Sequence, residues 1–279
     1  MLRESVFLNK IKNNMRGVCP SEARVLAQGA KGCFAIMEED MYSFESRVRY
    51  SEVDSEGYMT LNSVLDYFQD CSSFQSEELG VGLEFLMARN LAWVLTSWQV
   101  EIKRYPVYGE NITVSTWPYD FKGFFGYRNF LIKGKEEEIC AYANSIWVLL
   151  DLSSGKPARI LQKMIDAYEF LPRFPMEASS RKILLPKNME AKEPFPVHKY
   201  HIDTNRHVNN GKYVSMAQEY LPQGVQVGKM RAEYRKAAVY GDMVYPFAIP
   251  EEGKMIVNLA DEEGKPYAVI ELEEKRSCS

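Results

Sequence analysis

Residues 107–110 read Val-Tyr-Gly-Glu, and residues 239–242 read Val-Tyr-Gly-Asp, at an offset of 132 positions. A second match lies at an offset of 149, where Val53-Asp54-Ser55 corresponds to Ile202-Asp203-Thr204. Two ordered matches of this kind indicate an internal duplication. Because the offsets differ by 17, the first half carries 17 more residues, around Leu79 to Val94.

Both halves show the same order of periodic patterns, a helix followed by strands. Apolar residues first recur at helical spacing and then alternate with polar ones, as on a half-buried strand. A single helix followed by several strands excludes an alternating parallel sheet and predicts an α+β fold, in which each antiparallel sheet buries one face against its helix. The helical and strand positions are Leu61, Val64, Leu65 and Phe68, then Trp98, Val100 and Ile102, in the first half, and Tyr213, Met216, Ala217 and Tyr220, then Met230, Ala232 and Tyr234, in the second.

The halves are separated by a segment of different composition. Pro157 to Leu171 is predicted to be helical, and residues 172–196 carry five prolines among many charges, which is typical of a linker. We therefore predict four parts. They are a loose extension (1–40), an N-terminal domain (41–155), a linker (156–196) and a C-terminal domain (197–279).

Composition narrows the function classes. The net charge of −4 argues against a nucleic-acid-binding protein, and no apolar run reaches the roughly 20 residues of a membrane helix. Five widely spaced cysteines without a C-x-x-C pair suit a reducing cytoplasm. Residues 1–36 hold six Lys/Arg and two Glu, so a plastid-targeting leader is the alternative to a cytoplasmic location with a loose extension.

The candidate catalytic groups lie in the second half. Asp203, Asn205 and His207 alternate with other residues, so an extended backbone would place all three side chains on one face. His207 is the natural general base because its ordinary pKa lies near neutrality, while Asp203 could orient the imidazole or act as the base itself. The spacing does not decide between these two roles.

The residues that follow predict a helix start. Asn209 or Asn210 can cap it, which leaves unpaired N–H groups and the positive end of the helix dipole beside the three polar side chains. Such a helix start can stabilise a carbonyl oxygen as it becomes an oxyanion. A thioester suits this site, because a thiol leaves with little assistance.

The run Asp203-x-Asn205-x-His207-Val208-Asn209-Asn210-x-Lys212-Tyr213, followed by Glu219 and Glu233-Tyr234-Arg235-Lys236, resembles the fatty acyl-ACP thioesterases of plants and bacteria. The resemblance implies two tandem hot-dog domains, each an antiparallel sheet wrapped around a central helix. It also implies hydrolysis of acyl-ACP to free fatty acid and acyl carrier protein (ACP) in fatty acid biosynthesis, with Asp203, Asn205 and His207 catalytic.

One departure from the family pattern concerns the residues after Lys236. Plant members carry a Glu-Cys pair there, and this chain has Ala237 and Ala238. A Cys–His mechanism at that position is therefore excluded, and Glu233 and Glu219 become candidates for the missing carboxylate.

The remaining expectations concern binding. The first half aligns Glu56 with Asn205 and Tyr58 with His207, so we expect it to have lost catalysis and to hold the acyl chain. His198 and His201 lack the spacing of a metal site, and neither a metal nor a cofactor is expected. The acyl-chain candidates are Leu61, Val64, Leu65, Phe68 and Trp98, and the candidates for binding acidic ACP are Lys212, Arg231, Arg235 and Lys236.

Several alternatives stay open from the residues alone. They are an acyl-CoA thioesterase, a hot-dog hydratase or dehydratase, and a non-catalytic acyl-binding sensor. No DNA-binding helix pair is predicted to serve as a sensor's output element. Chain length, saturation preference and homodimer formation are not determined by these patterns.

Overall fold

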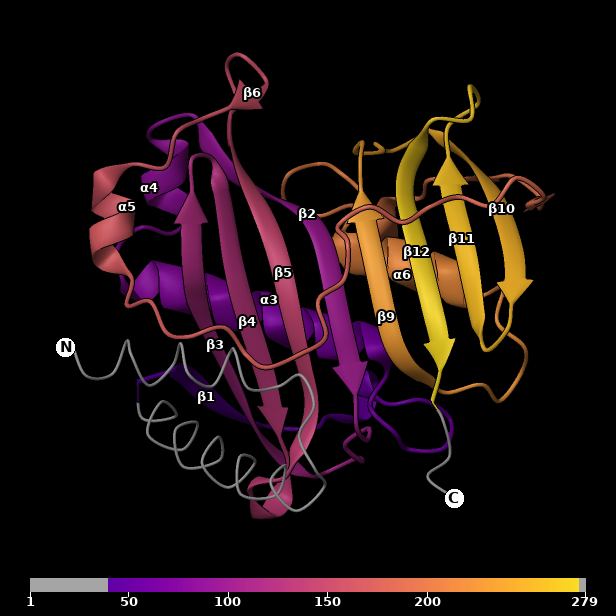
Figure 1. The fold of residues 1–279 in the computed structure, drawn as a ribbon, viewed down its shortest axis with the longest axis horizontal. Coiled ribbons are helices and arrows are strands. Elements are labelled where there is room, and N and C mark those ends of the chain that lie inside the picture. The colour runs from indigo at the N-terminus through magenta and orange to yellow at the C-terminus, as the bar shows by residue number, and fades with distance from the viewer. Residues whose placement is uncertain (1–39, 276–279) are drawn as a thin grey trace, which may run out of the picture. The chain divides into compact units, whose positions relative to one another are not determined.

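The computed structural model describes residues 40–275, and the chain from Tyr42 onward forms one compact unit (Figure 1). The expected extension at 1–40 lies outside the described residues except for its last position. No helix of the described part is long and apolar enough to cross a membrane. The helices are α3 (Leu61–Glu78), α4 (Leu83–Met87), α5 (Gln162–Ala167) and α6 (Asn210–Gln218), with short 3-10 turns η1 (Tyr50–Glu52), η2 (Lys135–Glu137) and η3 (Lys199–His201).

One antiparallel sheet holds the fold together, and its order is β1-β3-β4-β5-β2-β9-β12-β11-β10-β7. Strands β2 and β9 join the two halves, and Gln99 pairs with Arg231, its own counterpart at the offset of 132. A pseudo-twofold axis therefore passes between these two residues. The strands are β1 (Tyr42–Arg47), β2 (Leu91–Ile102), β3 (Asn111–Lys122), β4 (Phe125–Lys133), β5 (Ile139–Asp151), β6 (Lys156–Pro157), β7 (Glu190–Ala191), β8 (Phe195–Pro196), β9 (Val227–Tyr234), β10 (Met243–Glu251), β11 (Lys254–Ala260) and β12 (Pro266–Glu274).

The two long helices lie on the same face of the sheet, α3 behind the first-half strands and α6 behind the second-half strands (Figure 1). Thr60 caps α3 by accepting a hydrogen bond from the Ser63 N–H at 3.1 Å. The predicted apolar stripe of α3 is buried, and it shares one core cluster with the stripe of α6 and the inward side chains of both halves of the sheet. The expected α+β tandem hot-dog fold is confirmed.

The predicted helix from Pro157 to Leu171 is wrong except over α5. The Ala158 and Ile160 N–H groups bond to carbonyls of Leu149 and Gly123, so this stretch is tied to the sheet edge before a helix can begin. Tyr168 has extended backbone angles and ends α5. The additional first-half residues lengthen α3, which has 18 residues against the 9 of α6, and also form α4 and the beginning of β2.

The proline-rich segment crosses the face of the sheet opposite the helices (Figure 1). Gln99 donates to the Glu177 carbonyl at 2.8 Å, and Arg231 donates to the Ser180 carbonyl at 2.6 Å. The two residues on the pseudo-twofold axis thus both hold this segment, which places the outer side chains of β2 and β9 beneath it.

Candidate active site

The segment from Asp203 to His207 is a tight turn, so the predicted extended backbone is wrong. The Asp203 N–H donates to the His207 carbonyl at 2.8 Å, and Arg206 has a φ of +64°. The Asp203 carboxylate oxygen Oδ1 accepts hydrogen bonds from the N–H groups of Asn205 (2.8 Å) and His207 (3.2 Å). A short carboxylate that satisfies nearby backbone donors favours a turn over a strand. Asp203 therefore shapes the loop that presents Asn205 and His207.

The helix that follows is capped by Asn209, the first of the two predicted candidates. Its Oδ1 accepts from the Gly211 N–H at 2.8 Å, and its own N–H donates to the His201 carbonyl at 2.8 Å. Asn210 is the first residue of α6, and its carbonyl accepts from the Tyr234 hydroxyl at 3.0 Å. Within residues 40–275 the Asn210 N–H has no hydrogen-bond partner, which leaves this donor available at the positive end of α6.

The turn rests on the strand connection that carries the Ala-Ala departure. The Val208 N–H donates to the Ala238 carbonyl at 2.9 Å, and His207 forms a β-bridge with Val239. The Ala238 N–H donates to the Tyr213 hydroxyl at 2.9 Å, and the Ala238 side chain is fully buried. Tyr213 was not predicted as a site residue, although it belongs to the predicted helical stripe. Burial raises its pKa, so it stays a neutral phenol that ties α6 to the Ala238 loop.

His207 and Asn205 are exposed on this turn. In the described part of the chain, the His207 imidazole has no side-chain hydrogen-bond partner. The Asp203 Oδ1 accepts hydrogen bonds from backbone N–H groups instead of from the imidazole. The imidazole is thus accessible to substrate or water without first breaking an internal contact.

The first half repeats this backbone with other side chains. The Asp54 N–H donates to the Tyr58 carbonyl at 2.8 Å, and the Asp54 Oδ1 accepts from the N–H groups of Glu56 and Tyr58, both at 3.0 Å. Gly57, with a φ of +84°, occupies the place of Arg206. The duplication is confirmed by these matching hydrogen bonds. The first-half turn has Glu56 and Tyr58 where the second has Asn205 and His207.

Neither candidate replacement carboxylate lies at the turn. Glu233 points to the outer face of β9, where it accepts from Arg235 (2.9 Å) and from the Ile183 N–H (3.0 Å). Burial of Glu233 opposes ionisation, but these hydrogen bonds outweigh burial and lower its pKa. Glu219 follows the last turn of α6, at the end away from Asn210, and is exposed.

The proposed acyl-chain residues form a packed aromatic and aliphatic cluster between α3 and the first-half strands. The ring centroids of Phe68 and Trp98 lie 6.0 Å apart, and Phe130 lies 4.9 Å from Trp98 and 5.2 Å from Phe68. Phe130 was not predicted as an acyl-chain residue, because the sequence pattern of a strand does not show which helix its side chains contact. All five predicted residues, Leu61, Val64, Leu65, Phe68 and Trp98, are buried here.

Three of the four side chains proposed to bind ACP form salt bridges within the chain. Arg231 binds Glu271 at 2.9 Å, Arg235 binds Glu233 at 2.9 Å, and Lys236 binds Asp261 at 2.9 Å. Lys212, in the first turn of α6, forms no salt bridge among residues 40–275.

The other histidines are structural neighbours of the turn. The His201 Nδ1 accepts from the His198 N–H at 3.0 Å, and His201 is buried. Burial, together with the charges of His198 and Lys212, lowers the pKa of His201. His201 is therefore held in place as a hydrogen-bond acceptor below the helix start.

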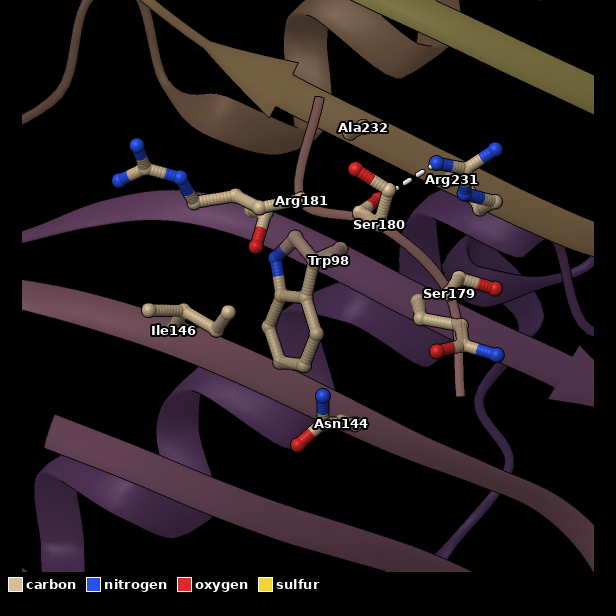
Figure 2. Close-up of a pocket in the computed structure, with 10 residues that line it drawn as sticks. Trp98, Asn144, Ile146, Ser179, Ser180, Arg181, Arg231 and Ala232 are labelled. Carbon is tan, nitrogen blue, oxygen red and sulfur yellow. Dashed lines mark hydrogen bonds between the residues drawn. The ribbon is translucent and has the colours of Figure 1, made fainter. Parts of the chain in front are cut away.

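Figure 2 shows a small cavity of about 20 Å³ on the outer face, between the linker residues Ser179–Arg181 and the strands β2, β5 and β9. Trp98, Asn144 and Ala232 line it, and Arg231 bonds to the linker at its edge. The volume is that of one or two water molecules. This cavity belongs to the linker contact and is separated by the sheet from the helix face.

Family models match most of the chain. The model of the acyl-ACP thioesterase N-terminal domain matches residues 39–168, and that of the C-terminal domain matches residues 185–268.

Individual relatives are more distant. An acyl-[acyl-carrier-protein] hydrolase of Cuphea viscosissima, named chloroplastic, is 26% identical over 68% of this chain and 50% of its own length. The chloroplastic oleoyl-acyl carrier protein thioesterase 2 of Arabidopsis thaliana is 22% identical over 81% of this chain and 68% of its own. The chain thus spans about half the length of the first of these relatives.

Solved structures agree with the fold. An acyl-ACP thioesterase from Bacteroides thetaiotaomicron has a TM-score of 0.78 at 22% identity, covering 85% of this chain and 99% of that one. The 12:0-ACP thioesterase of Umbellularia californica has a TM-score of 0.75 at 19% identity, covering 85% and 98%. The tandem arrangement is shared with both.

Proposed function

Because the chain belongs to the acyl-ACP thioesterase family, we propose that it hydrolyses fatty acyl-ACP to free fatty acid and ACP in fatty acid biosynthesis. The observation that carries the proposal is the Asp203–His207 turn, which sets an exposed imidazole directly before the start of α6. The counterpart turn of the first half has no imidazole, so we assign catalysis to the second half alone.

In the proposed reaction, the thioester carbonyl oxygen lies at the start of α6, where the Asn210 N–H and the helix dipole stabilise the developing oxyanion. His207 assists proton transfer from the attacking water, and Asn205 binds the water or the carbonyl. Asp203 preserves the turn through its two backbone hydrogen bonds. The thiol of the carrier then leaves and the acid is released.

We further propose that different segments of the chain have different functions. Residues 41–155 hold the acyl chain around Phe68 and Trp98, residues 156–196 are the linker, and residues 197–279 are catalytic. The packed state of the cluster means that an acyl chain enters by displacing side chains between α3 and β2.

The docking face for ACP is proposed on the rim of the turn rather than on β9. Residues 199–212 carry Lys199, Arg206 and Lys212 against Asp203, a net charge of +2, whereas the matching residues 50–63 carry three acids and no base. An acidic carrier is attracted to the first surface and repelled by the second. The exposed position of Arg206 at the turn supports the assignment, because it is next to His207.

The alternatives differ in their substrates. An acyl-CoA thioesterase would need no carrier contacts, a hydratase or dehydratase would act on the acyl chain, and a sensor would bind without turnover. The relatives are named chloroplastic, so the plastid is an alternative to the cytoplasm as the compartment of this protein. A homodimer is also left open.

The test offers the purified protein a panel of medium- and long-chain acyl-ACPs with the matching acyl-CoAs and measures thiol release. We expect hydrolysis of acyl-ACP, and a loss of about 100-fold or more in kcat for His207→Ala. Asp203→Ala should lose activity together with the loop geometry. Acyl-ACP binding without thiol release would contradict the proposal, and equal rates on CoA esters would favour the acyl-CoA alternative.

A further inference from the structure

The first two turns of α3 and of α6 contact each other. The Ser215 hydroxyl of α6 donates to the Asn62 Oδ1 of α3 at 3.0 Å. A Cβ placed on Gly211 would lie 2.9 Å from that Asn62 oxygen and 3.5 Å from the Asp66 Oδ1. Side chains of the first half therefore reach the start of the second-half helix, directly after the His207 turn.

The duplication makes this contact informative. At the offset of 149, Asn62 corresponds to Gly211 and Asp66 corresponds to Ser215. The start of α6 thus faces a carboxylate from α3, whereas the start of α3 faces a hydroxyl from α6. Of the two helix starts, the one that follows His207 is also the one that faces a carboxylate.

Asp66 is available for chemistry. Its Oδ2 accepts from the Asn62 amide at 2.7 Å, while its Oδ1 has no hydrogen-bond partner among residues 40–275, and the side chain is accessible to solvent. Partial burial raises its pKa, and the charge of Lys212 opposes this. Glu233 and Glu219, by contrast, lie on the other face of the sheet and at the far end of α6.

We propose that Asp66, contributed by the first half, is the general base that completes the second-half site in place of the carboxylate lost at Ala237. This inference rests on the proposed thioesterase function. Asp66 Oδ1 removes a proton from water as the water oxygen bonds to the thioester carbonyl carbon. The C–S bond then breaks, and the proton passes to the departing thiolate, so that acid and thiol are formed with no other reactant. In this mechanism Asp66 replaces His207 as the group that takes the proton from water, and His207 binds the tetrahedral intermediate together with the Asn210 N–H.

The experiment compares Asp66→Asn with Asp70→Asn, a matched change one helical turn further along α3. Steady-state thiol release from acyl-ACP is measured together with thermal unfolding. We expect kcat to fall about 100-fold or more for Asp66→Asn with KM changed less than about threefold, and Asp70→Asn to stay within about twofold of the wild type. Asp66→Glu should recover part of the rate, which a packing role for the short side chain would not permit.

A second variant separates chemistry from folding. Asp66→Ala should regain activity with increasing formate, because a small carboxylate can occupy the vacated space, whereas Asp70→Ala should not respond. Near-wild-type kcat in Asp66→Asn, or a loss unresponsive to formate, overturns the inference while leaving the proposed function intact. If the wild type releases no thiol from any acyl-ACP, the proposed function itself fails.

Discussion

An ion cluster around Glu110 in the first half offers a quantitative test of how much a carboxylate–guanidinium pair stabilises the fold. Arg104 donates to Glu110 from Nη1 (2.9 Å) and from Nη2 (2.5 Å), and it also binds Glu138. The Glu110 carboxylate accepts in addition from the N–H groups of Val107 and Lys135 at 3.0 and 3.2 Å. At the offset of 132, Lys236 corresponds to Arg104 but binds Asp261 instead.

Replacing Glu110 with Gln removes the charge while keeping the shape of the side chain. The Arg104 hydrogen bonds lower the pKa of Glu110 from 4.5 to about 2, and only 8% of its side chain is exposed. Since one pKa unit corresponds to about 1.4 kcal/mol, ionised Glu110 contributes about 3 kcal/mol of stability above its unfolded pKa. Because the folded pKa is depressed, this contribution is lost as the pH falls from about 4.5 through about 2.

The assay is urea unfolding of the wild type and Glu110→Gln at pH 7 and pH 4. We expect a difference of about 3 kcal/mol at pH 7 that shrinks by about 1 kcal/mol at pH 4, as protonation of unfolded Glu110 begins to reduce the wild-type advantage. The control, Glu137→Gln, removes the charge of an exposed carboxylate that pairs with Lys133, and it should change stability by less than about 1 kcal/mol. A difference that is small at pH 7, or that grows toward pH 4, would refute the argument. Acyl-ACP hydrolysis at pH 7 should be unchanged at a temperature where both proteins are folded.

Two further changes probe the second-half turn. Ala238→Cys should give no gain in kcat and should lower the stability by about 1–3 kcal/mol, because the added sulfur enters a fully buried position beside Tyr213. A rate increase of tenfold or more in the thiol-release assay would show that the missing cysteine matters. Arg206→Gly should keep or raise the unfolding temperature, since glycine accepts the positive φ without strain. The same variant should raise KM for acyl-ACP but not for acyl-CoA, and a KM change shared by both substrates would remove Arg206 from the carrier surface.

Local sequence patterns were sufficient to predict α3, β2 and the cap at Asn209, because these features depend on residues close together in the chain. The helical stripe of α3 and the alternation along β2 follow from periodicity, and the apolar positions of both are buried as predicted. The cap at Asn209 depends only on the next two residues. The helix expected from Pro157 failed because hydrogen bonds from Ala158 to Leu149 and from Ile160 to Gly123, which lie on or beside neighbouring strands, compete with helix formation.

The catalytic roles of His207 and Asp203 stay predictions, and the structure corrects the backbone that carries them. Their alternation suggested a strand, whereas the Asp203 carboxylate accepts hydrogen bonds from backbone N–H groups and closes a turn. Arg231 and Arg235 read as free cations and are instead held by carboxylates and linker carbonyls. A sequence shows how many charges a chain has, while their partners depend on how strands and linker meet.

The duplication that opened the sequence, Val107–Glu110 repeated at Val239–Asp242, determined the order of elements in each half and the correspondence of the two turns. Only the tertiary structure decided which side chains of one half meet the other. Asp66 approaches Gly211 because α3 and α6 lie on one face of a sheet joined at Gln99 and Arg231. That approach depends on packing across the pseudo-twofold axis, between residues 145 positions apart, for which no local spacing rule exists.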